Sequence, residues 1–434
     1  MLIFGDCTLA QRSDLRMWDP YSEFESTTLP NGLSVYACKW ARPWQTIGFV
    51  VHSGARHDPI GLEGLSHYVE HLVSQNAPIA SKEIESFFGS HGGSVMFGST
   101  GYSSTNYNFF VATKQDAVAR ALDIFGSMLI DAELQNSIER EREVIIQEFF
   151  RKYPAKVKVE FESREVKAVY GGTWRERFLS PLGFPESVRR ITQSDLQAYY
   201  DANYTPANIS VVCVGGMGLS ELADILSSSP FGKAKRGQRR PLPAKETDAP
   251  LPFESGYIFK MSEFLRADVS TDAGAYLSMA RIPGVVSSNA ISGVRSVLAK
   301  VLFEEVREKR AWTYHIAAGF DDFGDMFGFF IDCGSIVPGA LGEIAGVVND
   351  CLSEVAERED MLRNTQQEAV LNLWMQDPNG RQVRDGVMSD LESHQRIKTL
   401  VEIEEEITIV TAEDVSNVLK WLKPERRWTR ISRP

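Results

Sequence analysis

The stretch Gly64-Leu65-Ser66-His67-Tyr68-Val69-Glu70-His71-Leu72 decides both the fold and the chemistry that this sequence predicts. On a helix, His67 and His71 lie four residues apart, so both imidazoles project from one face. Two imidazoles at this spacing can share a zinc ion, and Glu70 lies beside them as a candidate general base. The order H-x-x-E-H is the reverse of H-E-x-x-H and offers the same two ligands and one base.

The motif alone leaves two interpretations open. Leu65, Val69 and Leu72 form the apolar stripe of a helix that packs into a core, so the two histidines could be incidental residues of an ordinary helix. A short motif gains weight only from its context, and that context lies further along the chain.

The composition is that of a soluble globular protein, with 43% hydrophobic and 24% charged residues. A length of 434 residues predicts two domains of roughly 200 residues each. The net charge of −12 argues against nucleic acid or an anionic membrane surface as the main partner. No apolar run reaches the length of a transmembrane helix, so we expect no membrane partner.

The N-terminal segment and the cysteines favour a cytoplasmic protein. Residues 1–24 include three aspartates and have no apolar run of signal-peptide length. The cysteines are odd in number, widely spaced and without a C-x-x-C motif, so we expect reduced thiols. They are Cys7, Cys38, Cys213, Cys333 and Cys351.

A charged helix predicted at 138–151 carries a possible third ligand. Glu141 and Glu148 lie seven residues apart and therefore share one stripe of this helix. A catalytic zinc needs three protein ligands and an open position, and two histidines with one carboxylate is a common set. Glu148 would complete that set and Glu141 would support a ligand. From the pattern alone, a solvent-facing residue of a highly charged helix explains Glu148 better than a metal ligand does.

A stretch rich in Gly and Ser at 94–105 predicts an edge strand. Edge strands can accept an extended peptide as an added strand, although the same pattern fits an ordinary edge strand. The candidate substrate strand consists of Ser94, Val95, Met96, Phe97, Gly98 and Ser99.

The chain carries the same pair of helix-start and helix-stop signals twice. A capping box at Thr192 opens a helix that Pro206 ends, and a second capping box at Thr411 is followed by Pro424. The two threonines differ by 219 positions and the two prolines by 218, which predicts two copies of one domain. We expect an N-terminal extension at 1–28, a zinc-binding domain at 29–226, a Pro-rich linker at 227–253 and a second domain at 254–434.

The predicted linker carries a cluster of five basic residues. A solvated tether explains this cluster better than a surface that binds an acidic partner. The residues are Lys233, Lys235, Arg236, Arg239 and Arg240.

Taken together, these segments resemble the M16 family of zinc peptidases, the group of pitrilysin, insulin-degrading enzyme and mitochondrial processing peptidase. In that family H-x-x-E-H is followed after roughly 75 residues by a helix of the type E-R-x-V-x-x-E. Here 76 residues separate His71 from Glu148, and the stretch from Glu141 to Glu148 is similar to that helix.

The resemblance implies one zinc ion held by His67, His71 and Glu148, with Glu70 as general base and Glu141 as ligand support. It also implies an α+β fold of two homologous LuxS/metalloenzyme-like domains that form half of a clamshell. Each domain is expected to be a mixed, mostly antiparallel sheet with helices packed on one face.

In the C-terminal half, Arg307 and Tyr314 match the family's Arg/Tyr pair, which helps to hold substrate across from the metal. Chains of this length are similar to the small class, which works as homodimers or heterodimers. The implied function is a zinc-dependent endopeptidase that hydrolyses short or unfolded peptides bound as an extended strand in a closed chamber. The alternative is a non-catalytic or partner-dependent subunit of a heterodimeric peptide-processing peptidase.

The sequence departs from the family pattern at three places. The chain continues after the histidines with 73–78 where the family has F-x-G-T, and Met96-Phe97 replaces Asn-Ala. The Gly-rich loop that usually precedes the Arg/Tyr helix is shortened near 298–302. These changes concern substrate contacts and leave the predicted metal ligands intact.

Overall fold

The computed structural model describes residues 18–76, 80–260, 273–376 and 378–433, so Cys7, Ala77 and Pro78 lie outside the described residues. The chain divides into two compact units, each built from three segments. Unit 1 comprises the described residues of Met1–Lys152, Ser180–Leu242 and Leu373–Glu402. Unit 2 comprises those of Tyr153–Leu179, Pro243–Asn372 and Ile403–Pro434.

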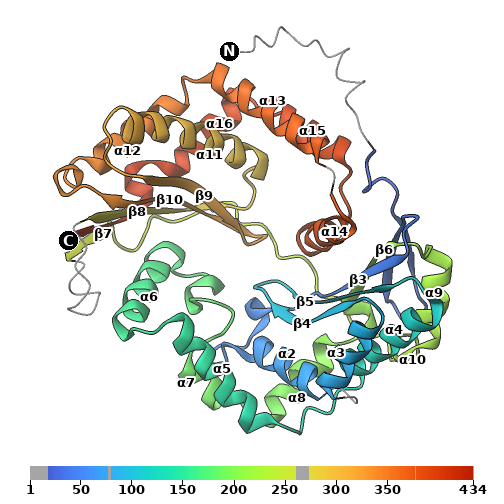
Figure 1. Cartoon of the computed structure of the whole chain (residues 1–434). Coiled ribbons are helices and arrows are strands. Elements are labelled where there is room, and N and C mark those ends of the chain that lie inside the picture. Colours follow the sequence, from blue (N-terminus) through green and yellow to red (C-terminus); the bar gives the residue numbers. More distant parts are fainter. Residues whose placement is uncertain (1–17, 77–79, 261–272, 377, 434) are drawn as a thin grey trace. The chain divides into compact units, whose positions relative to one another are not determined.

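The sheet of unit 1 has the strand order β1-β2-β6-β3-β5-β4. Figure 1 labels its strands β6, β3, β5 and β4. The neighbouring strands are antiparallel except for β2 and β6, which run parallel. The strands are β1 Glu25–Thr28, β2 Ser34–Lys39, β3 Trp44–Val51, β4 Ser94–Thr100, β5 Thr105–Ala112 and β6 Ile209–Gly215.

Helices of unit 1 cover one face of this sheet and enclose a large apolar core. Phe49 of β3 stacks between two aromatic rings, with centroids 5.1 Å from Phe125 and 5.3 Å from Phe231. The helices are α2 Leu65–Gln75, α3 Ser81–Ser90, α4 Gln115–Ile130, α5 Ile138–Lys152, α7 Pro185–Arg190, α8 Gln193–Asn203, α9 Leu219–Ser228 and α10 Pro230–Lys233.

The second face of the unit 1 sheet is covered as well, by α14 (Gly380–His394). Val50 and Val212 alternate with the residues of the main core and pack against Val387 and Met388. A Cβ atom at Gly48 would lie 2.2 Å from Met388 Sδ, which shows how closely α14 approaches the strand. Helices on a single face were predicted, and this was wrong for unit 1, because β3 and β6 are buried on both faces.

Unit 2 contains a sheet with the order β7-β11-β8-β10-β9, which repeats the order of β2-β6-β3-β5-β4 in unit 1. Its one parallel pair, β7 with β11, corresponds to β2 with β6. This match confirms the predicted duplication and the mixed, mostly antiparallel sheets. The strands are β7 Gly256–Lys260, β8 Gly274–Pro283, β9 His315–Asp322, β10 Met326–Ile336 and β11 Arg427–Arg433.

The two units each take a helix from the other half of the chain. Helix α6 (Lys156–Tyr170) packs on β8 and β11 of unit 2, where Phe161 stacks on Tyr257 at 5.3 Å. Glu165 pairs with Arg430 of β11. Because α6 lies in unit 2 and α14 in unit 1, the chain passes between the units more than once. The prediction had a single crossing, at the linker 227–253.

The other helices of the second half follow the same plan. They are α11 Ser288–Leu302, α12 Ile344–Val355, α13 Glu359–Met375, α15 Leu400–Thr408 and α16 Ala412–Leu419. The short turns are η2 Ala55–His57, η3 Trp174–Arg177, η4 Pro206–Asn208, the π-helical η6 Phe303–Glu308, η7 Pro338–Ala340, η8 Lys420–Leu422 and η9 Pro424–Arg426. Both predicted capping boxes are present, at Thr192 and at Thr411.

Part of the basic cluster at 233–240 is anchored rather than solvated. Arg239 donates to Ser210 Oγ at 3.2 Å, and Arg240 donates through Nε to Asn203 Oδ1 at 2.9 Å. The prediction of a freely solvated cluster was therefore wrong for these two arginines. Within the described residues, none of the helices combines the length and the apolar character that crossing a membrane requires.

Candidate metal centre

Helix α2 begins at a tightly held turn. The Asp58 carboxylate accepts hydrogen bonds from the backbone N–H groups of Gly64 (2.8 Å) and Ser66 (2.9 Å), two donors that the helix itself leaves unpaired. Gly64 has φ +101°, and a Cβ atom there would lie 2.6 Å from the carbonyl oxygen of Leu182. The start of α2, and with it the direction of its histidines, is thereby determined.

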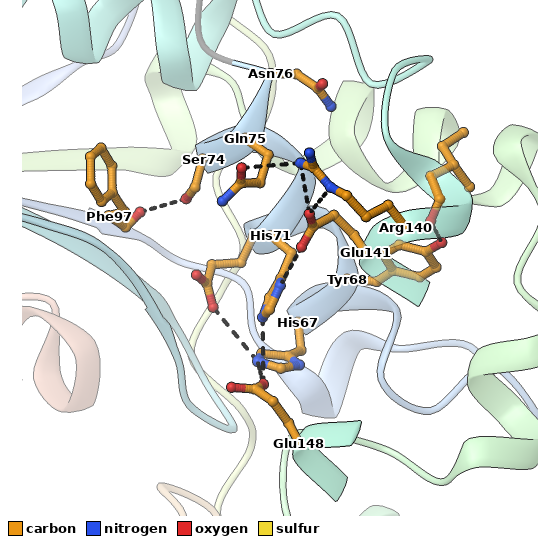
Figure 2. Close-up of polar contacts among 12 residues, drawn as sticks. His67, Tyr68, His71, Ser74, Gln75, Asn76, Phe97, Arg140, Glu141 and Glu148 are labelled. Carbon is orange, nitrogen blue, oxygen red and sulfur yellow. Dashed lines mark hydrogen bonds and ion pairs between the residues drawn. The ribbon is translucent and has the colours of Figure 1, made fainter. Parts of the chain in front are cut away.

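The structure brings the three predicted ligands together. The rings of His67 and His71 lie 4.6 Å apart at 72° to one another, and Glu148 of α5 approaches both (Figure 2). Glu148 Oε2 lies 3.6 Å from His67 Nε2 and 3.5 Å from His71 Nε2. A tetrahedral site with bonds of about 2.05 Å has ligand-to-ligand edges of about 3.4 Å, so these separations suit a zinc ion.

Glu141 lies behind His71 on the side away from Glu148 (Figure 2). Its buried carboxylate lies 3.1 Å from His71 Nδ1, so a proton on Nδ1 leaves Nε2 free as a ligand atom. Arg140 in turn donates to Glu141 Oε1 at 3.0 Å and to Gln75 Oε1 at 3.2 Å. This chain of contacts orients the imidazole of His71, and Arg140 and Gln75 were not predicted as part of it.

Burial keeps the His67 ring neutral. The loss of hydration, together with smaller effects of His71 and Lys152, lowers the pKa of His67 to about 3. Among the described residues its Nδ1 has no hydrogen-bond partner. A neutral imidazole is the form that binds a metal ion, so the environment of His67 favours the ligand state.

Glu70 lies beside the candidate ligands and is buried against strand β4. Its Oε2 accepts a hydrogen bond from Thr100 Oγ1 at 3.2 Å and lies 3.9 Å from His67 Nε2. Burial raises the pKa of Glu70 to about 7, against the opposing effects of His71 and of the Thr100 hydrogen bond. A carboxylate with a pKa near 7 is well matched to general base work.

Gly98 gives Glu70 the space to lie against β4. A Cβ atom at Gly98 would stand 2.2 Å from Glu70 Oε1. The pairing of β4 with β5 shifts register between Met96 and Ser99, so Gly98 lies in an irregular part of the strand. Neither Thr100 nor this use of Gly98 was predicted. An isolated glycine within an edge strand was the one available signal, since it often marks a close approach.

The candidate ligands and Glu70 line a cavity of about 390 Å³. Arg151, Lys152, Pro181 and Leu182 are among the other lining residues, and Arg151 donates to Glu148 Oε1 at 3.3 Å. Of the predicted substrate strand, Gly98 and Ser99 line this cavity.

The rest of that strand has other contacts, although β4 is an edge strand as predicted. Val95 and Phe97 pack against the core, and the Phe97 carbonyl oxygen accepts a hydrogen bond from Ser74 Oγ at 2.7 Å. Ser94 Oγ accepts a hydrogen bond from Arg381, and Met96 is partly exposed. The side chains of Val95 and Phe97 therefore do not face the cavity. Not every residue of the predicted substrate strand can contact substrate through its side chain.

In unit 2, Arg307 and Tyr314 lie together. Arg307 belongs to the π-helical turn η6, and its guanidinium lies 4.4 Å from the ring centroid of Tyr314 and 4.9 Å from that of Phe303. The Tyr314 side chain is 79% exposed. A cation over two aromatic rings is held in place while its donors stay accessible.

Two family models match the sequence. The model described as "Insulinase (Peptidase family M16)" matches residues 41–176, and the one described as "Peptidase M16 inactive domain" matches residues 190–362.

The relatives with curated names mostly match about half of the chain. The mitochondrial-processing peptidase subunit beta of Blastocladiella emersonii is 29% identical over 49% of this chain and 44% of its own length. The cytochrome b-c1 complex subunit 1 of Bos taurus is 26% identical over 50% and 46%. The chain thus spans about half the length of these relatives. A protein of Bacillus subtilis named an uncharacterized zinc protease is 23% identical over 87% of this chain and 90% of its own.

Solved structures share the fold over nearly the whole chain. A protease from Helicobacter pylori superposes with a TM-score of 0.73 at 17% identity, over 95% of this chain and 99% of that one. The first half of the periplasmic protease PqqL from Escherichia coli gives 0.76 at 14% identity, over 95% and 92%.

Proposed function

The chain belongs to the M16 family of peptidases, and on this premise we propose that it is a zinc-dependent endopeptidase. The observation that carries the proposal is the convergence of two imidazole Nε2 atoms and one carboxylate oxygen, from His67, His71 and Glu148. The fourth corner of such a tetrahedron is free of protein ligands in this set, as a catalytic site requires.

The proposed chemistry divides between the metal and the protein. Zinc held by these ligands would lower the pKa of a bound water toward neutrality and polarise a peptide carbonyl. Glu70 would accept the proton of that water and pass it to the leaving amine. Thr100 and Gly98 support this role because one hydrogen-bonds the Glu70 carboxylate and the other leaves space for it.

The proposed substrate is a short or unfolded peptide that pairs with β4 as an added strand. The edge position of β4 and the presence of Gly98 and Ser99 at the cavity support this choice. Arg307 and Tyr314 would also bind substrate, because the guanidinium and the exposed phenol can both donate hydrogen bonds. We further propose a cytoplasmic location and a dimer.

A second candidate is a subunit that cleaves peptides only beside a similar chain. The names of several relatives, "subunit beta" and "subunit 1", support it. Gel filtration of the chain alone, followed by an assay of each fraction, distinguishes the two. Activity in a fraction of the isolated chain favours the self-sufficient enzyme, and activity that returns only with a second chain favours the subunit.

The test combines metal analysis with hydrolysis of a quenched peptide library. The wild-type chain should hold about one zinc equivalent, and a chelator should abolish hydrolysis. Glu148→Gln should lose zinc and activity together, whereas Glu143→Gln, an exposed glutamate of the same helix, should keep both. Hydrolysis that survives the chelator, or a full zinc equivalent in Glu148→Gln, would overturn the proposal.

A further inference from the structure

A second cavity, in unit 2, has the opposite electrostatic character to the acidic chain around it. It measures about 320 Å³ and lies where α12, α16 and the start of β11 meet. Its lining includes Lys420, Lys423 and Arg427 and no aspartate or glutamate. The chain as a whole has 58 acidic and 46 basic residues, so a cavity with three cations and no carboxylate departs from its composition.

We propose that this cavity binds a small organic anion, a carboxylate carried on an apolar body. The proposal is independent of the peptidase activity, because it concerns residues of unit 2 that take no part in the candidate metal centre.

Arg427 is the central observation. Its side chain is buried, and its guanidinium donates to Ser278 Oγ at 3.1 Å, to Tyr276 Oη at 3.5 Å and to Asn349 Oδ1. These acceptors are neutral, and within the described part of the chain the guanidinium has no carboxylate partner and its Nε no hydrogen bond. Burial of a cation without a counterion is unfavourable, so the site is poised for an anion.

The duplicated fold shows that packing does not require a charge at this position. Strands β6 and β11 each begin directly after a single helical turn that opens with a proline, Pro206 or Pro424. The first residue of β6 is Ile209, which is fully buried in the core of unit 1. An apolar side chain therefore satisfies the fold where unit 2 has Arg427, which favours a binding role for the arginine.

The rest of the lining defines the body of the ligand. Leu352, Ala356, Leu419 and Leu422 give the cavity an apolar wall, and Ser353 and Ser416 add hydroxyl groups. Cavities of this volume accept small molecules, and apolar walls contribute affinity where a few polar groups determine orientation. A carboxylate with an apolar body uses both the cations and the wall, whereas inorganic phosphate would leave the wall unused.

Two kinds of molecule carry this chemistry, a free organic acid and the C-terminal residue of a peptide. The probes are N-acetyl-leucine, its C-terminal amide, N-acetyl-Ala-Ala-Leu and inorganic phosphate, each titrated calorimetrically into the full chain. N-acetyl-leucine should bind at least about tenfold more tightly than its amide and than phosphate, since the amide loses a charge-assisted interaction. Tripeptide binding at least as tight as that of N-acetyl-leucine identifies a peptide C-terminus, and weaker binding identifies a free acid.

Three substitutions locate the site. Arg427→Ile places in β11 the residue that opens β6, so it should fold and lose about tenfold or more in affinity for N-acetyl-leucine. Lys420→Gln and Lys423→Gln change exposed residues and should each weaken binding several-fold, while Lys300→Gln, at a partly exposed lysine outside the cavity, should not. Equal binding of the acid and the amide, phosphate binding as tight as N-acetyl-leucine, or unchanged affinity in both Arg427→Ile and Lys420→Gln would overturn the proposal.

Discussion

The two units share one sheet topology but differ in what the first α-helix after the matching strands β3 and β8 buries. In unit 1, α2 lies between β3 and β4 and buries His67 and Glu70. In unit 2, α11 lies between β8 and β9 and buries only alanine and aliphatic residues, such as Ile291 and Val294. The corresponding helix is therefore built with and without buried ionisable groups, and the fold of a unit does not require the candidate metal centre.

The difference shows where the chemistry was added to the scaffold. Unit 1 places imidazoles and carboxylates where unit 2 has ordinary packing, and their burial shifts the pKa values of His67 and Glu70 in the directions that suit a ligand and a base. Because the residues of the candidate metal centre are not needed to stabilise the fold, we expect them to be dispensable for folding and essential for activity. Four predictions test this contrast.

The largest effect is expected for Glu70→Gln. The glutamine is nearly isosteric and cannot accept the proton of the attacking water, so hydrolysis should fall by about 10² to 10⁴-fold. Zinc content should stay at the wild-type level, because Glu70 is not among the three converging ligand residues. Peptide turnover and metal analysis on the same sample measure both quantities.

The folding of Glu70→Gln is the second half of this test. The substitution removes a buried ionisable group, so the melting temperature of the metal-free protein should not decrease. A Glu70→Gln protein that turns over peptide at the wild-type rate would exclude this residue from the mechanism. A strongly destabilised one would contradict the contrast between the units.

A smaller effect is expected for Glu141→Gln. The carboxylate orients His71 through Nδ1, and loss of such a partner typically weakens metal binding by about 10 to 100-fold. Zinc affinity is measured by competition with a chelator of known strength, and Glu143→Gln on the same helix is the control. Wild-type affinity in Glu141→Gln would show that the ring of His71 is oriented by packing alone.

The third prediction concerns acid stability and again separates the units. His52 of unit 1 is buried with Nε2 2.9 Å from Ser210 Oγ, and burial together with the charge of Arg239 lowers its pKa to about 3. The unfolded chain, with a histidine pKa near 6.5, takes up the proton first. The stability that neutral His52 contributes is therefore present above pH 6.5 and is lost as the pH falls toward 3, by about 2 kcal/mol at pH 5.

Hydrogen exchange at pH 7 and pH 5 measures this loss strand by strand. Amides of β6 should lose more protection than those of β10. Strand β6 contains Ser210, which contacts the buried His52, whereas the histidine next to β10, His315 of β9, is exposed. His52→Gln can still bond Ser210 but does not titrate, so it should reduce the pH dependence of β6. An unchanged pH dependence in that variant would assign the acid sensitivity to other groups.

The parts of this molecule that the sequence predicts are those that local spacing determines. The convergence of His67 and His71 was predictable because a helix places residues four apart on one face. The position of Glu148 beside them was predictable because the spacing between the two motifs matches a known family pattern. The exchange of α6 and α14 between the units was missed, because no local pattern records which sheet a helix packs against. The contact of Gly98 with Glu70 was missed for the same reason, since it depends on an irregular pairing of β4 with β5.

The smallest effect is expected where unit 2 joins its helices by an ion pair instead of by candidate metal ligands. Lys300 of α11 lies 2.8 Å from Glu368 of α13, and both side chains are substantially exposed. Exposed pairs contribute only about 0.2 to 1 kcal/mol, because water and salt screen the charges. A double-mutant cycle with Lys300→Met and Glu368→Met, measured by urea unfolding, should give a coupling energy within that range that decreases at high salt. A coupling of several kcal/mol would mean that a single polar pair stabilises unit 2 strongly, and the contrast between a scaffold held by apolar packing and a site built from polar groups would no longer hold.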